Sequence, residues 1–414
     1  MKLFIEISSL LQIRESSEEI VRGRQMDEIP SIENAWLAVN NGLIEDFGPM
    51  ATLNQDRFND YEIVSCKGQI ILPTWVDSHT HLVFAQWREK EFEDRIQGLS
   101  YEEIAARGGG ILNSARALDD ASEETLYSEA MLRLNRLISM GTGAIEIKSG
   151  YGLSMDSELK MLRVIKRIKE TAPIPVKSTF LGAHAFPEKY QNNKEGYVTE
   201  IIEDMLPEIK RQNLAEYIDV FCEKGYFDLD QTERILKAGK TIGLKAKVHV
   251  NQFNAFGGVK TSVDQRAISV DHLEELADND VESLKASATI PVALPSCSFF
   301  LSIPYTPARR LMNANLPLAL ATDFNPGSTP SGNMNFVVSL ACIKMGMTPN
   351  EAINAATLNG AAAIELSNEI GSITIGKRAN LMVFNPGVNK AFIPYSFGQS
   401  SIDSVYINGE KIRT

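Results

Sequence analysis

The chain has 414 residues, 44% of them hydrophobic, which is enough to bury one large core and a smaller one. Its formal net charge of −12 disfavours a nucleic acid or an anionic membrane as a partner. No apolar run approaches the roughly 20 residues that a membrane span needs, and the early charges argue against a signal peptide. The four cysteines stand far apart in apolar runs, which predicts reduced core thiols and a cytoplasmic protein.

Both ends of the chain carry short strand patterns with tight turns between them. Asn41-Gly42 near the start and Asn408-Gly409 near the end are hairpin signals, and each is flanked by short apolar runs. We therefore predict a small composite β-sandwich domain made of residues 1–67 and 370–414. The two parts of this domain are separated in the sequence by the middle of the chain.

Residues 68–369 alternate between strand and helix patterns, which predicts an α/β catalytic domain. The strand-like runs lie at residues 69–76, 144–148, 176–181, 218–222, 245–248, 267–270, 290–295 and 316–322. Helices are predicted from about Asp156, over 198–207 and 229–242, and from the capping box at Thr348 to about Leu366.

About eight strands over roughly 300 residues favour a (β/α)8 TIM-like barrel over an open doubly wound sheet. A Gly-x-Gly-x-x-Gly motif after a strand is missing, and Gly108-Gly109-Gly110 precedes a helix-like run instead. A dinucleotide-binding Rossmann enzyme is therefore disfavoured.

All five histidines and one aspartate follow strand-like runs, at His79, His81, His184, His249, His272 and Asp323. His79 and His81 are two residues apart, so in an extended chain both rings face one side and suit one metal ion. In a barrel, the carboxyl ends of the strands meet at one face and carry the active site. A single histidine there is explained by packing, whereas six such groups in equivalent positions favour a functional site.

Three imidazoles and one carboxylate suit a zinc or iron ion that leaves a position open for water. Such an ion lowers the pKa of its water to about 7, which supports hydrolysis of a carbonyl or amidine carbon. Asp323 can also take a proton from the water, and His272 can polarise a carbonyl or pass protons. We predict a metal-dependent hydrolase that acts on a small molecule.

Motifs along nearly the whole chain resemble one family. The order His79-Thr80-His81, Val248-His249, Asp271-His272 and Thr322-Asp323 is similar to that of the amidohydrolase superfamily. More specific runs, above all 148–153 (KSGYGL) and 323–328 (DFNPGS), resemble the imidazolonepropionase family within it. The resemblance implies a sandwich-plus-barrel fold, hydrolysis of the cyclic amide 4-imidazolone-5-propanoate to N-formimidoyl-L-glutamate in L-histidine degradation, and a homodimer.

The resemblance also implies roles for single residues. It makes His79, His81, His249 and Asp323 the ligands of one metal ion, Zn²⁺ or Fe³⁺. Proton transfer and ring orientation fall to Asp323, His272 and Gln252. The implied contacts with substrate or product are Arg88, Tyr151, His184, Gln252, Asn325, Gly327 and Ser328.

Three of the candidate residues also have plainer interpretations. Arg88 suits the propanoate tail of the substrate because arginine binds a carboxylate through two parallel hydrogen bonds, but it could also be a solvated loop charge. Tyr151 lies between two glycines, either presented from a tight turn or packed in the core. Lys148 is either a substrate-side charge or an ordinary lysine at a strand end.

Gln252 bears on the choice among amidohydrolases. Deaminase relatives with a one-metal site commonly carry a glutamate three residues after the third metal histidine, where this chain has Gln252 after His249. An amide forms hydrogen bonds but does not titrate, so Gln252 is expected to orient the ring. A nucleobase deaminase or a hydrolase of another cyclic amide stays open as an alternative. A non-catalytic scaffold is disfavoured because the ligand set is complete.

Overall fold

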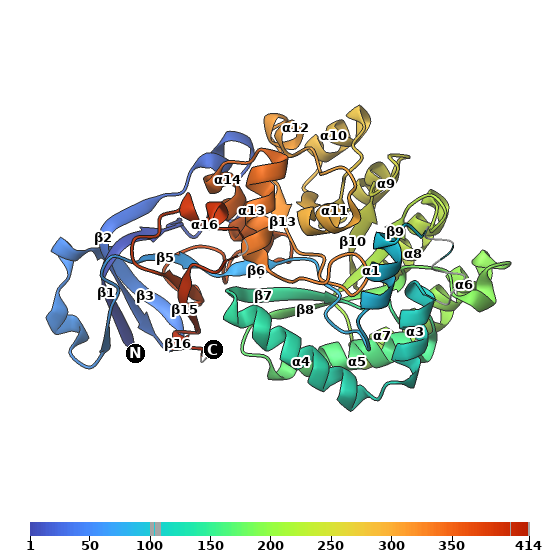
Figure 1. Ribbon diagram of the computed structural model, residues 1–414, viewed down its shortest axis with the longest axis horizontal. Coiled ribbons are helices and arrows are strands. Elements are labelled where there is room, and N and C mark those ends of the chain that lie inside the picture. The colour runs from blue at the N-terminus through green and yellow to red at the C-terminus, as the bar shows by residue number, and fades with distance from the viewer. Residues whose placement is uncertain (100–102, 104–108, 398, 413–414) are drawn as a thin grey trace.

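The chain folds into a small β-domain and a larger barrel domain, as Figure 1 shows for the computed structural model. The structure describes residues 1–99, 103, 109–397 and 399–412. The predicted fold class, a TIM-like barrel beside a small β-domain built from both chain ends, is confirmed. The exact predicted boundaries, 1–67 with 370–414 and 68–369, stay a prediction.

The β-domain is a mixed sheet with the strand order β16-β15-β14-β5-β1-β2-β3, and β4 also pairs with β1. Its strands are β1 (Lys2–Leu11), β2 (Ser31–Asn40), β3 (Leu43–Pro49), β4 (Glu62–Ser65), β5 (Ile70–Pro73), β14 (Leu381–Phe384), β15 (Ile402–Ile407) and β16 (Glu410–Lys411). The antiparallel pair β5–β14 joins the two ends of the chain, with Leu381 opposite Pro73. The inner face packs Phe4, Leu37 and Tyr406 into one apolar cluster.

The barrel has eight parallel strands within the described part of the chain, in the order in which they occur in the sequence. They are β6 (Trp75–Asp77), β7 (Thr142–Lys148), β8 (Val176–Ala183), β9 (Tyr217–Cys222), β10 (Lys245–Val250), β11 (Ser269–His272), β12 (Ile290–Ala293) and β13 (Ala319–Leu320). Beyond β13, the Asp323 backbone N–H donates to the His79 carbonyl oxygen at 3.0 Å, and the His81 N–H donates to Phe324 at 2.8 Å. The first and last strands therefore meet where three of the predicted metal ligands lie.

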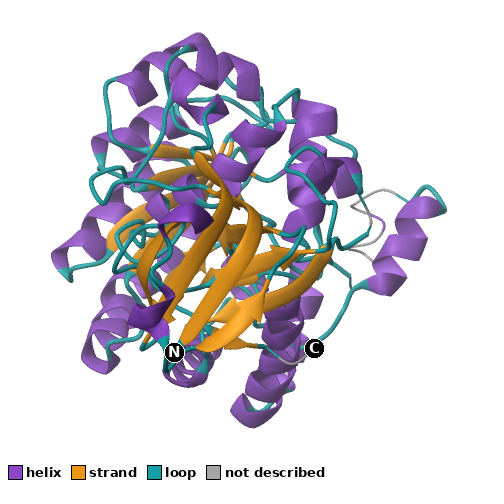
Figure 2. Ribbon diagram, turned by 90° about the vertical axis from the view of Figure 1, so that its left-hand side faces the viewer, coloured by secondary structure: helices purple, strands orange, loops and turns teal. Residues whose placement is uncertain are grey.

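Helices surround the barrel strands, as Figure 2 shows from the side of the β-domain. They are α1 (Glu89–Ile96), α3 (Ile111–Asp120), α4 (Glu123–Ser139), α5 (Met155–Thr171), α6 (Lys194–Thr199), α7 (Leu206–Gln212), α8 (Leu229–Thr241), α9 (Gly258–Asp264), α10 (Asp278–Lys285), α11 (Pro295–Leu301), α12 (Ala308–Asn313), α13 (Met334–Met345), α14 (Pro349–Ala356), α15 (Leu358–Ala362) and α16 (Phe392–Tyr395). A π-helical turn, Glu200–Met205, joins α6 to α7, and α3 begins directly after Gly110. Gly108 lies outside the described residues.

Two elements differ from the sequence prediction. The single strand expected over 69–76 is two strands in different sheets, because β5 pairs with β14 while β6 pairs with β7. The break follows Pro73, which has no backbone N–H to continue a ladder. The single helix expected from the Thr348 capping box to about Leu366 is interrupted at Thr357, whose backbone leaves the helical region (φ −119°, ψ −88°).

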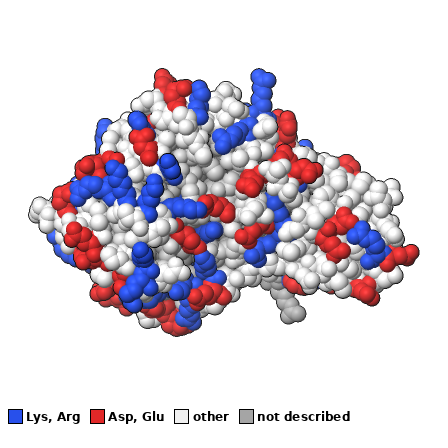
Figure 3. Space-filling model, turned by 180° about the vertical axis from the view of Figure 1, so that it is seen from behind, with Lys and Arg blue, Asp and Glu red and all other residues white. Residues whose placement is uncertain are grey.

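Several global predictions can be compared with the structure. All four cysteines are free thiols, and Cys342 is the only one of them that is not fully buried. Over the residues described, none of the helices combines the length and apolarity required to cross a bilayer. Positive and negative side chains are interspersed over the face shown in Figure 3, without a broad surface of one sign.

Candidate active site

Three predicted metal ligands converge at the end of the barrel where the strands end. One ring nitrogen from each of His79, His81 and His249 lies within 4.8 Å of the other two, and all three side chains are buried. Asp323 adds a carboxylate, with Oδ1 at 3.5 Å from the Nε2 atoms of both His79 and His81. The strands β6, β10 and β13 thus bring together residues that are far apart in the sequence.

The two carboxylates beneath the site fix the orientation of two of these rings. His79 Nδ1 lies 2.6 Å from Asp271 Oδ2, and His249 Nδ1 lies 2.9 Å from Asp219 Oδ2. With Nδ1–H donated to a carboxylate, Nε2 is left as the lone-pair atom. In the described part of the chain, the Nε2 atoms of His79 and His249 have no hydrogen-bond partner. A cation bound between these two nitrogen atoms and the nearby carboxylate would satisfy their lone pairs, so the residues fit a metal ion.

Burial also keeps these rings neutral, which is the state that binds a metal. It lowers the pKa of His249 to about 3 and holds the pKa of His79 well below its ordinary value. Burial raises the pKa of Asp323 to about 6, against the opposing effect of the charge of His272. Without a counter-charge, the site therefore disfavours both a charged imidazole and a charged carboxylate.

Lys148 links the carboxylates that hold the histidines. Its Nζ lies 2.7 Å from Glu146 Oε1, 2.8 Å from Asp219 Oδ2 and 3.8 Å from Asp271 Oδ2, and the side chain is fully buried. Burial alone would lower the pKa of Lys148, but the charges of these carboxylates raise it, so the ammonium is retained. Lys148 is the last residue of β7, as the strand-end interpretation predicts, and it bridges the carboxylates that hold the candidate metal ligands.

His272 and His184 lie on either side of the ligand cluster. The ring of His272 is 5.9 Å from that of His79, and its Nδ1 faces Glu274 Oε1 at 3.3 Å. Burial acts to lower the pKa of His272, but the charge and hydrogen bond of Glu274, together with the charges of Asp323 and Asp271, outweigh it and raise that pKa. His184 stacks on His81 with ring centroids 5.3 Å apart, and its Nδ1 is 2.9 Å from the Gly150 carbonyl oxygen.

Arg88 occupies the position that precedes helix α1. Its Nε donates to Glu91 Oε2 at 2.8 Å, and Nη2 contacts the same oxygen. Glu91 also accepts the Gly110 backbone N–H at 2.9 Å, so it ties Arg88 to the segment before α3. A methyl group at Gly327 would lie 2.3 Å from Arg88 Nη1. The Nη1 end of the guanidinium therefore lies against the loop after β13.

Tyr151 projects from a turn that a buried carboxylate holds. Glu158 in α5 accepts backbone N–H groups from Gly150, Gly152 and Leu153 at distances of 2.7–3.1 Å. The Tyr151 ring meets those of His81 and His184 edge-on, with centroids 5.6 and 5.5 Å apart. The glutamate therefore builds the turn, and the tyrosine forms one wall beside the ligand cluster.

The loop after β13 is organised by Asn325. Its Oδ1 accepts the backbone N–H groups of Gly327 and Ser328, both at 2.8 Å, and its Nδ2 donates to Ser328 Oγ at 2.7 Å. Ser328 Oγ in turn donates to Asp323 Oδ2 at 3.2 Å. Asn325 thus holds the turn, and Ser328 orients the Asp323 oxygen that points away from the histidines.

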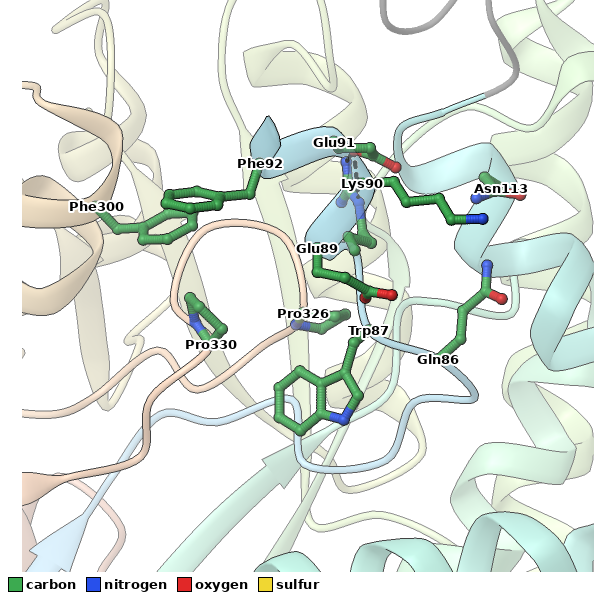
Figure 4. Close-up of a pocket in the computed structure, with 11 residues that line it drawn as sticks. Gln86, Trp87, Glu89, Lys90, Glu91, Phe92, Asn113, Phe300, Pro326 and Pro330 are labelled. Carbon is green, nitrogen blue, oxygen red and sulfur yellow. Dashed lines mark hydrogen bonds and ion pairs between the residues drawn. The ribbon is translucent and has the colours of Figure 1, made fainter. Parts of the chain in front are cut away.

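A cavity of about 870 Å³ opens beside Arg88. Its lining includes Trp87, Arg88, Phe92, Phe300 and Pro326. Figure 4 shows Phe92 lying against Phe300. Phe92 and Phe300 stack with ring centroids 5.5 Å apart. Glu89, Lys90 and Glu91 also line this cavity, whereas the four candidate metal ligands are not among its lining residues.

The structure therefore gathers the predicted residues from all parts of the barrel. His184, His272, Tyr151 and Ser328 lie near the ligand cluster. Gln252 lies in the turn after β10, and Arg88, which lines the cavity, lies close to Gly327. Sequence reasoning missed the supporting carboxylates Glu91, Glu158, Asp219 and Asp271. Asp271 directly precedes His272 within a recognised motif, so the sequence could have identified it. The other three have no local pattern that distinguishes them from ordinary acidic residues.

Comparisons with known proteins agree on one family. The model of the Amidohydrolase family matches residues 70–412. The chain is 59% identical to the imidazolonepropionase of Christiangramia forsetii and 57% identical to that of Flavobacterium johnsoniae, with 99% of each chain covered. Among solved structures, E. coli guanine deaminase aligns with a TM-score of 0.73 over 100% of this chain and 98% of its own. At 15% identity, that similarity shows the fold alone.

Proposed function

This chain belongs to the imidazolonepropionase family of the amidohydrolases, and from this we propose that it hydrolyses 4-imidazolone-5-propanoate to N-formimidoyl-L-glutamate in L-histidine degradation. The observation that carries the proposal is the convergence of three neutral histidines on one carboxylate, with the Arg88 guanidinium against the loop that follows Asp323.

We propose His79, His81, His249 and Asp323 as the ligands of one metal ion. The orphan Nε2 atoms of His79 and His249 and the nearby Asp323 Oδ1 support this set. A bound Zn²⁺ or iron ion would act as a Lewis acid that activates water and polarises a carbonyl group. The donor set of three imidazoles and one carboxylate suits either metal, so metal content is a matter for direct measurement.

Arg88 is proposed to anchor the propanoate of the substrate. Nε and Nη2 contact Glu91, Nη1 lies close to Gly327, and the Arg88 side chain lines the cavity. Glu91 keeps the guanidinium in place, which reduces the entropy lost on binding. Tyr151 and His184, whose rings form adjoining walls, are proposed to contact the imidazolone ring.

Hydrolysis adds water to the ring carbonyl carbon and breaks the bond from that carbon to a ring nitrogen, so one proton must leave the water and one must reach the nitrogen. We assign the first to Asp323 Oδ2, which Ser328 orients and whose carboxyl has a pKa raised by burial to about 6. His272, held by Glu274, is assigned to donate a hydrogen bond to the oxygen that gains negative charge and to deliver the proton that the ring nitrogen takes up. Gln252 orients the ring without titrating, and Asn325, Gly327 and Ser328 contact the product.

The proposal is tested by incubating metal-assayed protein with freshly prepared 4-imidazolone-5-propanoate and following the loss of its ultraviolet absorbance. We expect turnover that disappears on chelation and returns when metal is restored. Full metal occupancy without turnover would overturn the substrate, and ammonia release on a purine and pyrimidine panel would then identify a deaminase. The cytoplasmic location and the homodimer stay predictions, and light scattering on the purified chain tests the latter.

A further inference from the structure

We propose that His272, Glu274 and Cys297 form a second cation site, which takes a thiophilic divalent ion such as Zn²⁺ or Cd²⁺ and thereby blocks His272. One ligand atom from each residue lies within 4.8 Å of the other two, and all three side chains are buried. None of the three belongs to the candidate ligand set of the first metal, although Cys297 hydrogen-bonds to Asp323 of that set and to Ser328 beside it. An imidazole, a carboxylate and a thiolate are a recognised donor combination for a tetrahedral zinc ion, with a fourth position left for water.

The backbone aims two of the donors at one point. His272 ends strand β11, and both His272 (φ 88°) and Leu273 (φ 63°) adopt left-handed conformations, which turn Glu274 back toward the histidine. His272 Nδ1 lies 3.3 Å from Glu274 Oε1. A charge-assisted N–H to carboxylate bond is typically about 2.7–2.9 Å, so this contact is long for an ion pair. Two ligands on one tetrahedral zinc ion, at bond lengths of about 2.0–2.2 Å, are separated by about 3.3 Å.

Glu274 has one carboxylate oxygen that the protein leaves unsatisfied. Oε1 accepts a hydrogen bond from Ser298 Oγ at 3.2 Å, whereas Oε2 is buried and lacks a partner anywhere in the described ranges. The Glu274 side chain has no exposed surface. A buried acceptor that the protein does not satisfy needs an explanation, and a cation in this cluster supplies one.

Cys297 determines which cations the site selects. It belongs to α11, is fully buried, and its Sγ lies 3.5 Å from Gln252 Nε2. A thiolate is a soft ligand that favours Zn²⁺ and Cd²⁺ over Mg²⁺ or Ca²⁺. Binding would release the thiol proton and any proton on His272 Nδ1, because both atoms must offer a lone pair to the ion.

Occupation of this site has a consequence for the reaction, and this part rests on the proposed function. With Nδ1 coordinated, His272 carries a proton on Nε2 alone and cannot be the imidazolium that delivers a proton to the ring nitrogen. The glutamate that holds the ring is engaged by the ion at the same time. An excess of a thiophilic ion should therefore inhibit an enzyme whose first metal site is already filled.

The test is a titration of the metal-loaded protein with Cd²⁺, followed by its ultraviolet thiolate-to-cadmium charge-transfer band and by total metal per chain after equilibration. None of the four candidate ligands of the first site is a thiolate, so a band that appears together with an additional ion per chain reports the second site. We expect one additional ion per chain and a band in the wild type, and neither in Cys297→Ser. Glu274→Gln should weaken Cd²⁺ binding by at least about tenfold. Cys342→Ser is the matched control, since it removes the more accessible thiol and should keep both signals.

The wild type failing to show a band at saturating Cd²⁺, or Cys297→Ser retaining the extra ion, would overturn the site. Turnover measured in the same samples should fall with added Cd²⁺ in the wild type and in Cys342→Ser but not in Cys297→Ser. If the band appears and turnover does not fall, the blocking of His272 is wrong. Absence of turnover in every sample, with the metal stoichiometry intact, would overturn the proposed substrate and leave the second cation site standing.

Discussion

Replacing Lys148 by methionine should weaken metal binding as well as the fold. The lysine Nζ lies 2.7 Å from Glu146 and 2.8 Å from Asp219, and every group involved is fully buried. Loss of one partner from a buried ion pair costs about 3–5 kcal/mol, because the remaining charge is left without compensation. Asp219 and Asp271 would then hold His249 and His79 less firmly. A supporting group of this kind typically contributes about 10- to 100-fold to metal affinity, or about 1.4–2.8 kcal/mol.

Two measurements separate these effects. Urea unfolding of the metal-free protein gives the change in the free energy of unfolding, and competition with a chromophoric chelator gives the metal dissociation constant. Lys247→Met is the matched control, because Lys247 is equally buried and contacts Glu146 at 3.3 Å and the Ala363 carbonyl oxygen at 2.9 Å. We expect both variants to be destabilised and Lys148→Met to lose clearly more metal affinity. Equal metal affinity in the two variants would refute the positioning role of Lys148.

Three further predictions address the substrate anchor and the response to pH. Arg88→Ala should raise KM by about 10- to 100-fold through loss of about 1.5–3 kcal/mol of charged hydrogen bonding, and an unchanged KM would contradict the anchoring role. Gly327→Ala should raise KM in the same steady-state assay, because the new methyl group would lie 2.3 Å from Arg88 Nη1; KM equal to that of the wild type would show that the guanidinium does not bind there. Burial lowers the pKa of Lys377 from 10.5 to about 8, so the unfolded chain holds more protons between these values and the free energy of unfolding should rise with pH across that window, by up to about 3 kcal/mol. Chemical denaturation at several pH values should show that Lys377→Met lacks this rise, and an identical slope in both proteins would rule out Lys377 as its source.

The sequence by itself determined the barrel, the composite β-domain and the candidates for the metal ligands. Alternating strand and helix patterns are local, and the two Asn-Gly turns mark hairpins without reference to the rest of the chain. Histidines are few here, so their recurrence after strand-like runs identified His79, His81 and His249 before any contact was known. The run 323–328 singled out Asp323 in the same way.

Tertiary structure alone decided what supports those residues. The division of 69–76 into β5 and β6 depends on strand partners from opposite ends of the chain, Leu381 for one and Thr142 for the other. Asp219 and Lys148 are 71 residues apart, and nothing in their local patterns marks them as neighbours. Buried charges are tolerated only where partners of opposite charge meet, and that meeting is a property of the closed barrel and not of any one segment.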